Sequence, residues 1–529
     1  MNKYISIIII ITFFITSSSL TGCKKNLLET IPNDRLATDL FWKTENDAIL
    51  AVNAIYPLLD GTNIFAWEGL TDIGHTNAFF GNDALIEKGS YDALNSRIFN
   101  EYNTAYQGIA RSNYVLDNID RVTTTNATLI NRLKSEARVL RAYQYIKLAM
   151  FFGDVILSTK TVTIEEGRQM KRTPVSEVWD FIDKELSESS AFLPNTYATV
   201  DKGRVTKGAA LALEARANLF AGRYQQAADA AKKVMDLNVY TLYPQYAKLF
   251  SYAAENNAEV IFDKQRIVDV ANTNVFQLMA PYSQKNSSNT YVPTKRLADM
   301  YSMSNGKNIN DASSGYNPSN PYVNRDPRIR FSIYVPGDIL PDGKIFNSTP
   351  TSGTADAVGG TMQATSTGYV LKKYINSEDY ATLSNSGINI ILLRYAEVLL
   401  TYAEAKIELN QIDQSVFDAI NKVRQRSDVN LPALPTTLTQ NELREAVRRE
   451  RTVELAFEGL RLFDIRRWKI AEIVIPGPVY GITYVSSGQL TTIQVLAFEK
   501  VFNKNRNYLW PIPQRERELN PNLTQNPGW

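Results

Sequence analysis

Apolar residues recur every three or four positions along much of the chain, and this spacing predicts a mainly helical protein. The first such stretch starts near Thr44, a residue type that can cap a helix. Further stretches with the same spacing are Ala105–Ile119, Leu129–Phe152, Val175–Leu193, Lys207–Leu219, Tyr224–Leu237, Ile391–Leu409, Ser415–Arg426 and Glu442–Trp468. The predicted helices therefore fall into two blocks, at about 41–240 and about 391–468.

Two of the predicted helices have the pattern of a tetratricopeptide unit. They span Ala209–Leu219 and Ala228–Leu237, and residues 222–227 between them read Gly-Arg-Tyr-Gln-Gln-Ala. In that repeat a Gly-x-Tyr-x-x-Ala turn joins two antiparallel helices, and small alanines let the helices approach closely. A weaker copy covers Tyr402–Leu409 and Val416–Val423. We therefore expect a scaffold of tetratricopeptide-like helical pairs, with an irregular helical bundle as the alternative.

A long insert separates the two helical blocks, at about residues 270–388. Asn, Ser, Gly, Thr and Pro dominate there, most strongly in Asn305–Asn320 and Asn347–Gly360. Loops of this length in a compact domain are usually functional or disordered. Short β-like runs occur at Ile329–Val335, Tyr369–Tyr374, Val479–Val485 and Thr491–Leu496, and the last two form a candidate hairpin. We expect one domain over 41–529, in which a helical platform supports a loop-rich insert with short β-strands.

The chain begins with the pattern of a signal peptide over residues 1–22. Lys3 gives a positive start, and Ile5–Leu20 is almost wholly apolar or small, yet too short for a comfortable membrane span of about 20 residues. The sequence Leu20-Thr21-Gly22-Cys23 resembles a bacterial lipobox, whose cysteine is lipidated and becomes the first mature residue. Cys23 is the only cysteine of the chain, which favours this interpretation over an ordinary signal peptide followed by a stray thiol.

A lipidated Cys23 would begin a polar tether over residues 23–40. Several acyl chains, at about 0.8 kcal/mol per buried methylene, are enough to hold a protein on a membrane. The apolar pattern after this segment predicts no further stretch that is long enough to be a transmembrane helix. The expected arrangement is a soluble body that is attached to a membrane through lipid at its N-terminus.

Composition and charge exclude several classes of function. The 529 residues include 57 lysines and arginines and 55 aspartates and glutamates, so the net charge is only +2, and no basic tract predicts nucleic-acid binding. One histidine and one cysteine cannot form an intrachain disulfide, a Cys/His zinc site or an iron–sulfur cluster. The sequence also lacks the P-loop, Rossmann, nucleophile-elbow and H-E-x-x-H motifs, so we expect no metal and no cofactor.

Acidic residues leave one enzymatic hypothesis open. Glu68 and Asp72 lie beside Trp67, and a pair of carboxyl groups is what glycoside hydrolases use. Nothing in the sequence marks either residue as having a shifted pKa, so surface or helix-capping carboxylates are the simpler interpretation. His75, the only histidine, lies in a Gly/Thr/Asn segment that is typical of a hydrogen-bonding surface residue. The charge-rich segment Arg448–Trp468 is interpreted as a buried helix with charge networks at its margins rather than a basic docking helix.

A series of motifs runs in a fixed order from Cys23 to the C-terminus. They are Phe41-Trp42-Lys43-Thr44, Asn53-Ala54-Ile55-Tyr56, Arg138–Tyr145, Phe152-Gly153-Asp154, Arg325–Arg328, Leu393–Ala405, Ile420–Arg424, Glu450–Trp468, Leu509–Pro513 and Gln525–Trp529. In content and order they resemble the SusD/RagB family of outer-membrane nutrient-binding lipoproteins. Most of these motifs are expected to belong to the scaffold rather than to a binding site, and the terminal ones are expected to pack the chain ends onto the helices.

The resemblance implies a non-catalytic protein that captures oligosaccharides, or sometimes peptides, as a lid on a SusC-like TonB-dependent transporter barrel. It also implies lipid anchoring on the outer membrane, facing the cell exterior. One departure concerns export, because Lys24 and Lys25 follow Cys23 where many such surface lipoproteins have acidic residues. A surface glycoside hydrolase, and a tetratricopeptide interaction scaffold without a small ligand, are the alternative functions.

The family varies its ligand loops, so binding residues can be proposed only from chemistry. Sugar rings have apolar faces and hydroxyl edges, which rigid aromatic side chains and amide groups recognise. Phe65–Asn82 and Pro281–Tyr291 combine such residues, and in the family these regions lie near the ligand face. The predicted ligand-binding residues are Trp67, His75, Asn77, Phe79, Phe80, Tyr282, Asn289 and Tyr291. Local packing is the alternative role for each of them.

Overall fold

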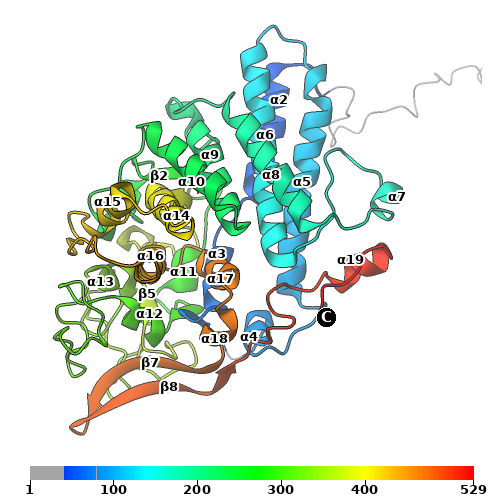
Figure 1. Ribbon diagram of the computed structural model, residues 1–529. Coiled ribbons are helices and arrows are strands. Elements are labelled where there is room, and N and C mark those ends of the chain that lie inside the picture. Colours follow the sequence, from blue (N-terminus) through cyan, green and yellow to red (C-terminus); the bar gives the residue numbers. More distant parts are fainter. Residues whose placement is uncertain (1–40, 79) are drawn as a thin grey trace, which may run out of the picture.

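The computed structural model describes residues 41–78 and 80–529. The predicted signal peptide (1–22), Cys23, the tether (23–40) and Phe79 lie outside the described residues. Helices dominate the described chain, and the loop-rich insert lies between two helical blocks, as the apolar pattern predicts (Figure 1).

The longer helices are α2 (Glu45–Asn53), α5 (Ser96–Asn118), α6 (Ala127–Phe152), α8 (Val175–Ser190), α9 (Lys207–Phe220), α10 (Tyr224–Asp236), α14 (Tyr395–Glu408), α15 (Gln414–Arg424) and α16 (Gln440–Glu454). The shorter ones are α3 (Asn63–Gly69), α4 (Asn82–Glu87), α7 (Ile164–Gly167), α11 (Val275–Met279), α12 (Lys295–Met300), α13 (Arg328–Ser332), α17 (Arg461–Arg467), α18 (Ala471–Val474) and α19 (Gln514–Leu519).

Most of the longer helices form one continuous stack. α5 packs on α6, α6 on α8, α8 on α9, α9 on α10, and α10 on α14, which in turn contacts α15 and α16 (Figure 1). The insert leaves this stack after α10 and returns before α14, yet the two helices remain neighbours. The stack is therefore continuous in space although the sequence interrupts it.

The predicted tetratricopeptide-like pair is confirmed as α9 and α10. Gly222, with φ 73°, lies in the tight turn between them, and a positive φ is a backbone conformation that glycine adopts without a steric penalty. The alanines of α10 are buried against the neighbouring helices. The predicted weaker copy is the packed pair α14 and α15.

Some of the predicted helices have different bounds in the structure. Helix α5 begins at Ser96, before the predicted start at Ala105. In the predicted helix Ile391–Leu409, the first residues belong to strand β6 (Ile390–Arg394), because every residue of that strand is buried and it pairs with β2 (Val260–Lys264). The predicted helix Glu442–Trp468 is two helices, α16 and α17. The chain turns between them at Phe457 and Gly459, which have φ angles of 60° and 81°.

The described strands pair as four separate two-stranded antiparallel sheets. They are β1 (Gly74–Thr76) with β3 (Tyr291–Pro293), β2 with β6, β4 (Ile333–Tyr334) with β5 (Val370–Leu371), and β7 (Gly477–Ser486) with β8 (Gln489–Lys500). The last pair confirms the predicted hairpin. The predicted run Tyr369–Tyr374 contains β5, whereas Ile329–Val335 is helical in its first half, where α13 lies.

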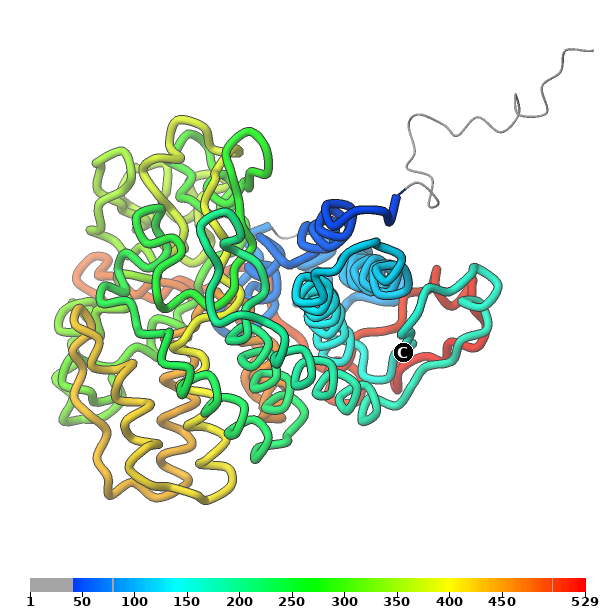
Figure 2. Tube along the Cα trace, turned by 90° about the horizontal axis from the view of Figure 1, so that it is seen from above, coloured from blue at the N-terminus to red at the C-terminus, as the bar shows by residue number. Residues whose placement is uncertain are grey.

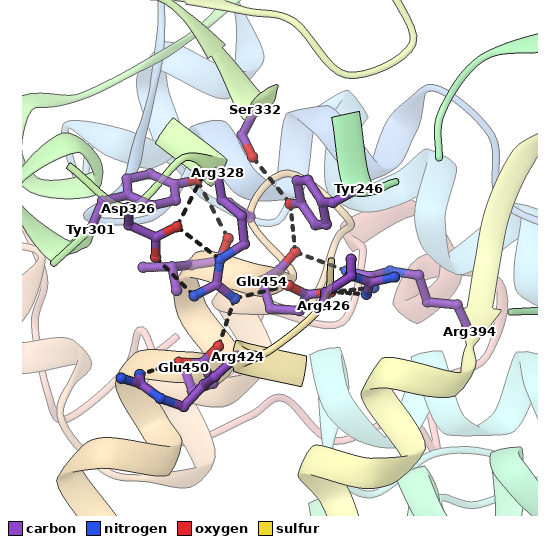
Figure 3. Close-up of polar contacts among 12 residues, drawn as sticks. Tyr246, Tyr301, Asp326, Arg328, Ser332, Arg394, Arg424, Arg426, Glu450 and Glu454 are labelled. Carbon is purple, nitrogen blue, oxygen red and sulfur yellow. Dashed lines mark hydrogen bonds and ion pairs between the residues drawn. The ribbon is translucent and has the colours of Figure 1, made fainter. Parts of the chain in front are cut away.

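A buried network of arginines and glutamates joins the insert to the helical stack (Figure 3). Glu454 of α16 accepts hydrogen bonds from Arg394 (2.7 Å), Arg426 (2.8 Å) and Arg328 (2.9 Å). Burial alone would raise the pKa of Glu454, but the charges of these three arginines outweigh it and hold the pKa well below its usual range. This agrees with the interpretation of the charge-rich segment as a buried structural element.

The two ends of the described chain pack onto the helical body, as expected. Trp42 is buried, and the indole of Trp510 stacks on Phe151 with ring centroids 4.0 Å apart. Asn526 donates to the backbone carbonyl groups of Phe152 and Trp510. Seen from above, the C-terminal segment lies at the end of the molecule opposite the insert (Figure 2).

One stretch of the described residues, Glu45–Gly69, is long and apolar enough by composition to cross a membrane, which the apolar pattern above does not predict. In the structure it is α2, a short 3₁₀ turn (Tyr56–Leu58) and α3. Its residues Val52, Ile55 and Phe65 are buried in the main hydrophobic core. Packing inside the helical body therefore accounts for its composition.

Candidate ligand-binding site

The small sheet β1–β3 joins the two segments in which the ligand-binding residues are predicted. His75 pairs with Val292 and Thr76 with Tyr291, and the backbone N–H of Asn77 donates to the carbonyl group of Thr290 over 2.8 Å. Segments more than two hundred residues apart in sequence thus form one structural unit. Their side chains, however, have very different exposures.

Trp67 lies in the aromatic core. Only 4% of its surface is exposed, and its indole makes edge contacts with Phe151 and Phe463. The indole N–H donates to Glu101 over 2.9 Å. In this structure the ring has no free face on which a sugar could stack.

His75 is fully buried, so its interpretation as a surface residue is wrong. Its Nδ1 lies 2.9 Å from Glu87, and Lys500 lies 2.6 Å from the same carboxylate. Burial would raise the pKa of Glu87, but the charges of Lys500 and His75 outweigh it and lower the pKa to about 2. The ring of Phe498 packs edge-on against the imidazole. His75 therefore belongs to a buried polar cluster that fastens β8 to β1.

Asn77 and Tyr291 also hold the loops together. The amide of Asn77 donates to the carbonyl group of Ala364 (3.0 Å) and accepts from the N–H of Ser366 (2.8 Å). The hydroxyl of Tyr291 donates to Asp83 over 2.7 Å. Both side chains are almost completely buried.

Asn289 is fully buried, and neither polar atom of its side chain has a hydrogen-bond partner. Its φ of 45° places the backbone in the left-handed region, which asparagine tolerates better than most residues.

Phe80 and Tyr282 are the predicted ligand-binding residues, among those described, whose side chains reach solvent. Phe80 is 72% exposed and Tyr282 is half-buried. Beside Tyr282, the N–H of Ser283 donates to Asp356 over 2.9 Å, and the ammonium of Lys285 lies 4.5 Å above the ring of Tyr380. The loops of the insert thus bring charged groups and the ring of Tyr380 close to the segment that contains Tyr282.

The two carboxylates of the hydrolase hypothesis are buried, not superficial. Glu68 is fully buried and accepts the backbone N–H groups of Leu460 (2.9 Å) and Arg461 (3.2 Å). Asp72 accepts two hydrogen bonds from Arg461, at 2.9 and 2.7 Å, and one from Arg296 at 2.7 Å. These bonds fix α17 and α12 to the segment before β1. A carboxyl group in the position of Glu68 has no path to a glycosidic oxygen in this structure.

A cleft of about 700 Å³ opens beyond the other end of the same small sheet. Asp72 precedes β1, and Thr294, Lys295 and Arg296 follow β3 on one wall of this cleft. The remaining walls come from a loop of the insert, from α16 and α18, and from the hairpin β7–β8. These two helices and the hairpin cluster in the lower left of Figure 1. Apolar residues on these walls are Met300, Val474, Ile475, Pro476, Pro478 and Val479.

The polar groups of this cleft were not predicted as site residues. Arg296, Arg449, Asn308, Asn310 and Tyr480 all line it. They come from α12, α16, a loop of the insert and β7, and no sequence motif connects them. Only the tertiary packing brings them to one place. Among the described residues no group of three or more His, Cys, Asp or Glu side chains is arranged to hold a metal ion.

Two family models together match most of the described chain, and a related protein aligns with nearly all of it. A family model described as "SusD family" matches residues 258–529, and one described as "Starch-binding associating with outer membrane" matches residues 43–219. SusD-like protein P2 of Formosa agariphila is 25% identical over 98% of this chain and 99% of its own length.

Solved structures show the same fold. A SusD-like carbohydrate binding protein of Bacteroides fragilis superposes with a TM-score of 0.84 at 29% identity, over 92% of this chain and 100% of the other. A second SusD-like protein of the same organism gives a TM-score of 0.81 at 27% identity, over 94% and 100% of the two chains.

Proposed function

The chain belongs to the SusD family, and we propose from this membership that it is a non-catalytic protein that captures a nutrient, an oligosaccharide, for uptake. The observation that supports the proposal best is the similarity over 92% of the chain to a carbohydrate-binding protein of the family, with a TM-score of 0.84. The fold offers what such a role needs. A rigid helical stack supports long loops, and the cleft of about 700 Å³ lies within the range of about 300–1,000 Å³ that is usual for small-molecule pockets.

We place the protein at the outer membrane, attached through lipid on Cys23 and facing the cell exterior. The lipobox-like sequence before Cys23 supports the anchor, and the family description that names association with the outer membrane supports the location. Mass spectrometry of the mature N-terminus tests the anchor, because an acylated cysteine adds the mass of its fatty-acid chains. A SusC-like TonB-dependent barrel is the partner on which the protein would act as a lid. Co-purification from detergent-solubilised membranes tests that partnership.

The binding role is tested with the soluble body, residues 41–529, which contains the whole described fold. Isothermal calorimetry against a panel of neutral and acidic oligosaccharides is expected to give saturable binding to at least one glycan class. Chromatography of the same mixtures is expected to return the glycan uncleaved. Binding without cleavage supports capture, whereas product release would favour the hydrolase. Failure of every glycan to bind would favour a peptide ligand or the interaction scaffold.

The structure makes the hydrolase the weaker of these alternatives. Its candidate acid, Glu68, is held by two backbone N–H groups and has no exposed surface. General acid catalysis requires the acid to lie within hydrogen-bonding reach of the atom that it protonates. The buried position of Glu68 therefore favours a structural role in the packing of α17.

A further inference from the structure

The 700 Å³ cleft has more positive than negative charge on its walls. Two acidic residues line it, Asp72 and Asp299, against four basic ones, Lys295, Arg296, Arg449 and Lys500. Not all of these charges are available to a ligand. Lys295 is paired with Asp299 at 2.7 Å, and the ammonium of Lys500 points inward to Glu87 and three backbone carbonyl groups. The two arginines are therefore the groups that decide what the cleft can bind.

Arg449 is half-buried in the cleft wall without a counter-ion. Its guanidinium makes no hydrogen bond or ion pair with the described residues. Burial lowers the pKa of Arg449, and the charge that opposes this effect belongs to Glu445, one turn earlier on α16 and itself largely exposed. A half-buried arginine normally gains a carboxylate or carbonyl partner, because its charge has lost part of its hydration. The guanidinium thus has donors available for an anion that enters the cleft.

Arg296 is only partly neutralised. Its Nε donates to Asp72, but that carboxylate also takes two hydrogen bonds from Arg461, so one negative charge serves two guanidinium groups. The side chain of Arg296 is 48% exposed. Its remaining N–H groups can donate to a ligand. Arg296 and Arg449 therefore give the cleft a local excess of positive charge although the whole chain is nearly neutral.

The other walls have the features that a sugar ring requires. Tyr480 is 43% exposed and lies beside prolines and aliphatic side chains, which form an apolar surface suited to the C–H face of a pyranose. Asn308 and Asn310 offer amide groups to hydroxyls on the loop side. A carboxylate or sulfate on the ring would meet the guanidinium groups, which bind such anions with two parallel hydrogen bonds.

We propose that this cleft binds an acidic oligosaccharide, in which a uronate carboxylate or a sulfate ester is held by Arg449 and Arg296 while the ring packs on Tyr480. The inference rests on the proposed function, since it names the class of nutrient that such a capture protein would take. The groups proposed to hold the ligand, Arg296, Arg449 and Tyr480, lie outside the segments in which the ligand-binding residues were predicted from sequence.

The test is calorimetry on the soluble body with three probes of equal length: tetragalacturonate for the carboxylate, a sulfated carrageenan tetrasaccharide for the sulfate ester, and neutral cellotetraose. We expect one of the acidic probes to bind and its affinity to fall several-fold when sodium chloride is raised from about 0.05 to about 0.5 M. Arg449→Gln is expected to weaken that binding by about tenfold or more, because it removes charge-assisted hydrogen bonds.

Two further variants separate the cleft from the rest of the surface. Asn310→Asp adds a negative charge to an exposed position of the cleft wall, so it is expected to weaken acidic binding several-fold without affecting folding. Arg444→Gln removes an arginine from the same helix that is bonded to Glu408 and lies outside the cleft. It is expected to bind like the wild type.

The outcomes are distinct. Acidic binding that Arg449→Gln and Asn310→Asp weaken, and Arg444→Gln preserves, supports the proposal. Acidic binding that is equal in all variants places the ligand elsewhere and overturns it. Binding of cellotetraose alone overturns it too, but leaves the proposed function intact. If no probe binds, this inference fails, and the wider glycan panel decides whether the proposed function fails with it.

Discussion

Burial changes the chemistry of single side chains, and Glu68 is the clearest case. Burial raises the pKa of Glu68 from 4.5 to about 7, against the opposing effects of the backbone N–H groups and Arg461. Its Oε2 has no hydrogen-bond partner. Between about pH 4.5 and about pH 7, Glu68 keeps its proton in the folded protein but has already released it in the unfolded chain. The contribution of Glu68 to stability is therefore complete below about pH 4.5 and is lost as the pH rises through about 7.

Glu68→Gln is expected to remove this part of the pH dependence, because glutamine keeps the acceptor oxygen but cannot ionise. At about pH 8 the variant should be at least as stable as the wild type, and the loss of stability between about pH 5 and about pH 8 should be smaller. Urea unfolding at about pH 5 and about pH 8 measures the free energy of unfolding of the variant and the wild type, and hence the loss of stability between the two pH values. Glu445→Gln, at an exposed position of α16, is the control and should keep the pH dependence of the wild type. The same dependence in both variants would contradict this account.

The residue type shows which chemical groups a predicted site residue has, but it does not show whether its side chain is exposed to solvent. Trp67 and His75 have the side chains that sugar sites use, yet both are buried. Phe80 is exposed, although its hydrophobicity alone would place it inside. Exposure depends on which distant segment covers a residue, and that information is absent from the local sequence.

At the scale of helices and turns, the α9–α10 unit depends on one backbone conformation. Gly222 has φ 73°, and a Cβ at this position would meet no atom within 4 Å. A substitution at Gly222 therefore tests the cost of the left-handed backbone conformation without adding a steric clash.

Gly222→Ala is expected to lower the free energy of unfolding by about 1 kcal/mol, because residues with a Cβ disfavour the left-handed region. Gly167→Ala is the matched control: its Cβ also meets open space, but its φ is not positive, so alanine there should leave the stability unchanged or raise it by up to about 1 kcal/mol. Urea unfolding measures both. Equal stabilities of the two variants would mean that the turn relaxes without cost.

Helices whose apolar spacing repeats over several turns, such as α6 and α10, are predicted correctly, because the pattern is a local property of each helix. The predicted helix bounds are wrong where contact with a neighbouring segment determines the backbone conformation. Ile390–Arg394 is apolar enough for either structure, and pairing with β2 makes it a strand. The turn between α16 and α17 includes Gly459, where a Cβ would lie 2.9 Å from Ile64 and clash, so close packing requires glycine there.

At the scale of the whole molecule, the network around Glu454 joins elements that are far apart in sequence. Arg328 comes from the insert, Arg394 from the end of β6, and Arg426 from the loop after α15. Glu259, just before β2, bonds to both Arg394 and Arg426. Removing one partner of a buried ion pair costs about 3–5 kcal/mol, because the remaining charge is left uncompensated.

Glu454→Gln is therefore expected to lower the free energy of unfolding by about 3–5 kcal/mol. Urea unfolding measures the loss, and Glu445→Gln on the same helix again serves as the exposed control. Glu450→Gln is a milder variant for the case in which Glu454→Gln does not fold, since Glu450 is bonded to Arg328 and Arg424. If neither variant is less stable than the control, the network does not hold the insert to the stack.

Most of the helices, the tetratricopeptide-like pair and the family could be predicted from the amino-acid sequence alone. Helical periodicity and motif order are properties of short segments, so they can be read without knowing what lies next to them. Which residues a ligand can reach became clear from the packing of the folded chain. The arginines, asparagines and tyrosine of the cleft come from four segments, and the predicted aromatic and imidazole groups are largely covered by others. Access to solvent is set by contacts between distant parts of the chain, and no local pattern records those contacts.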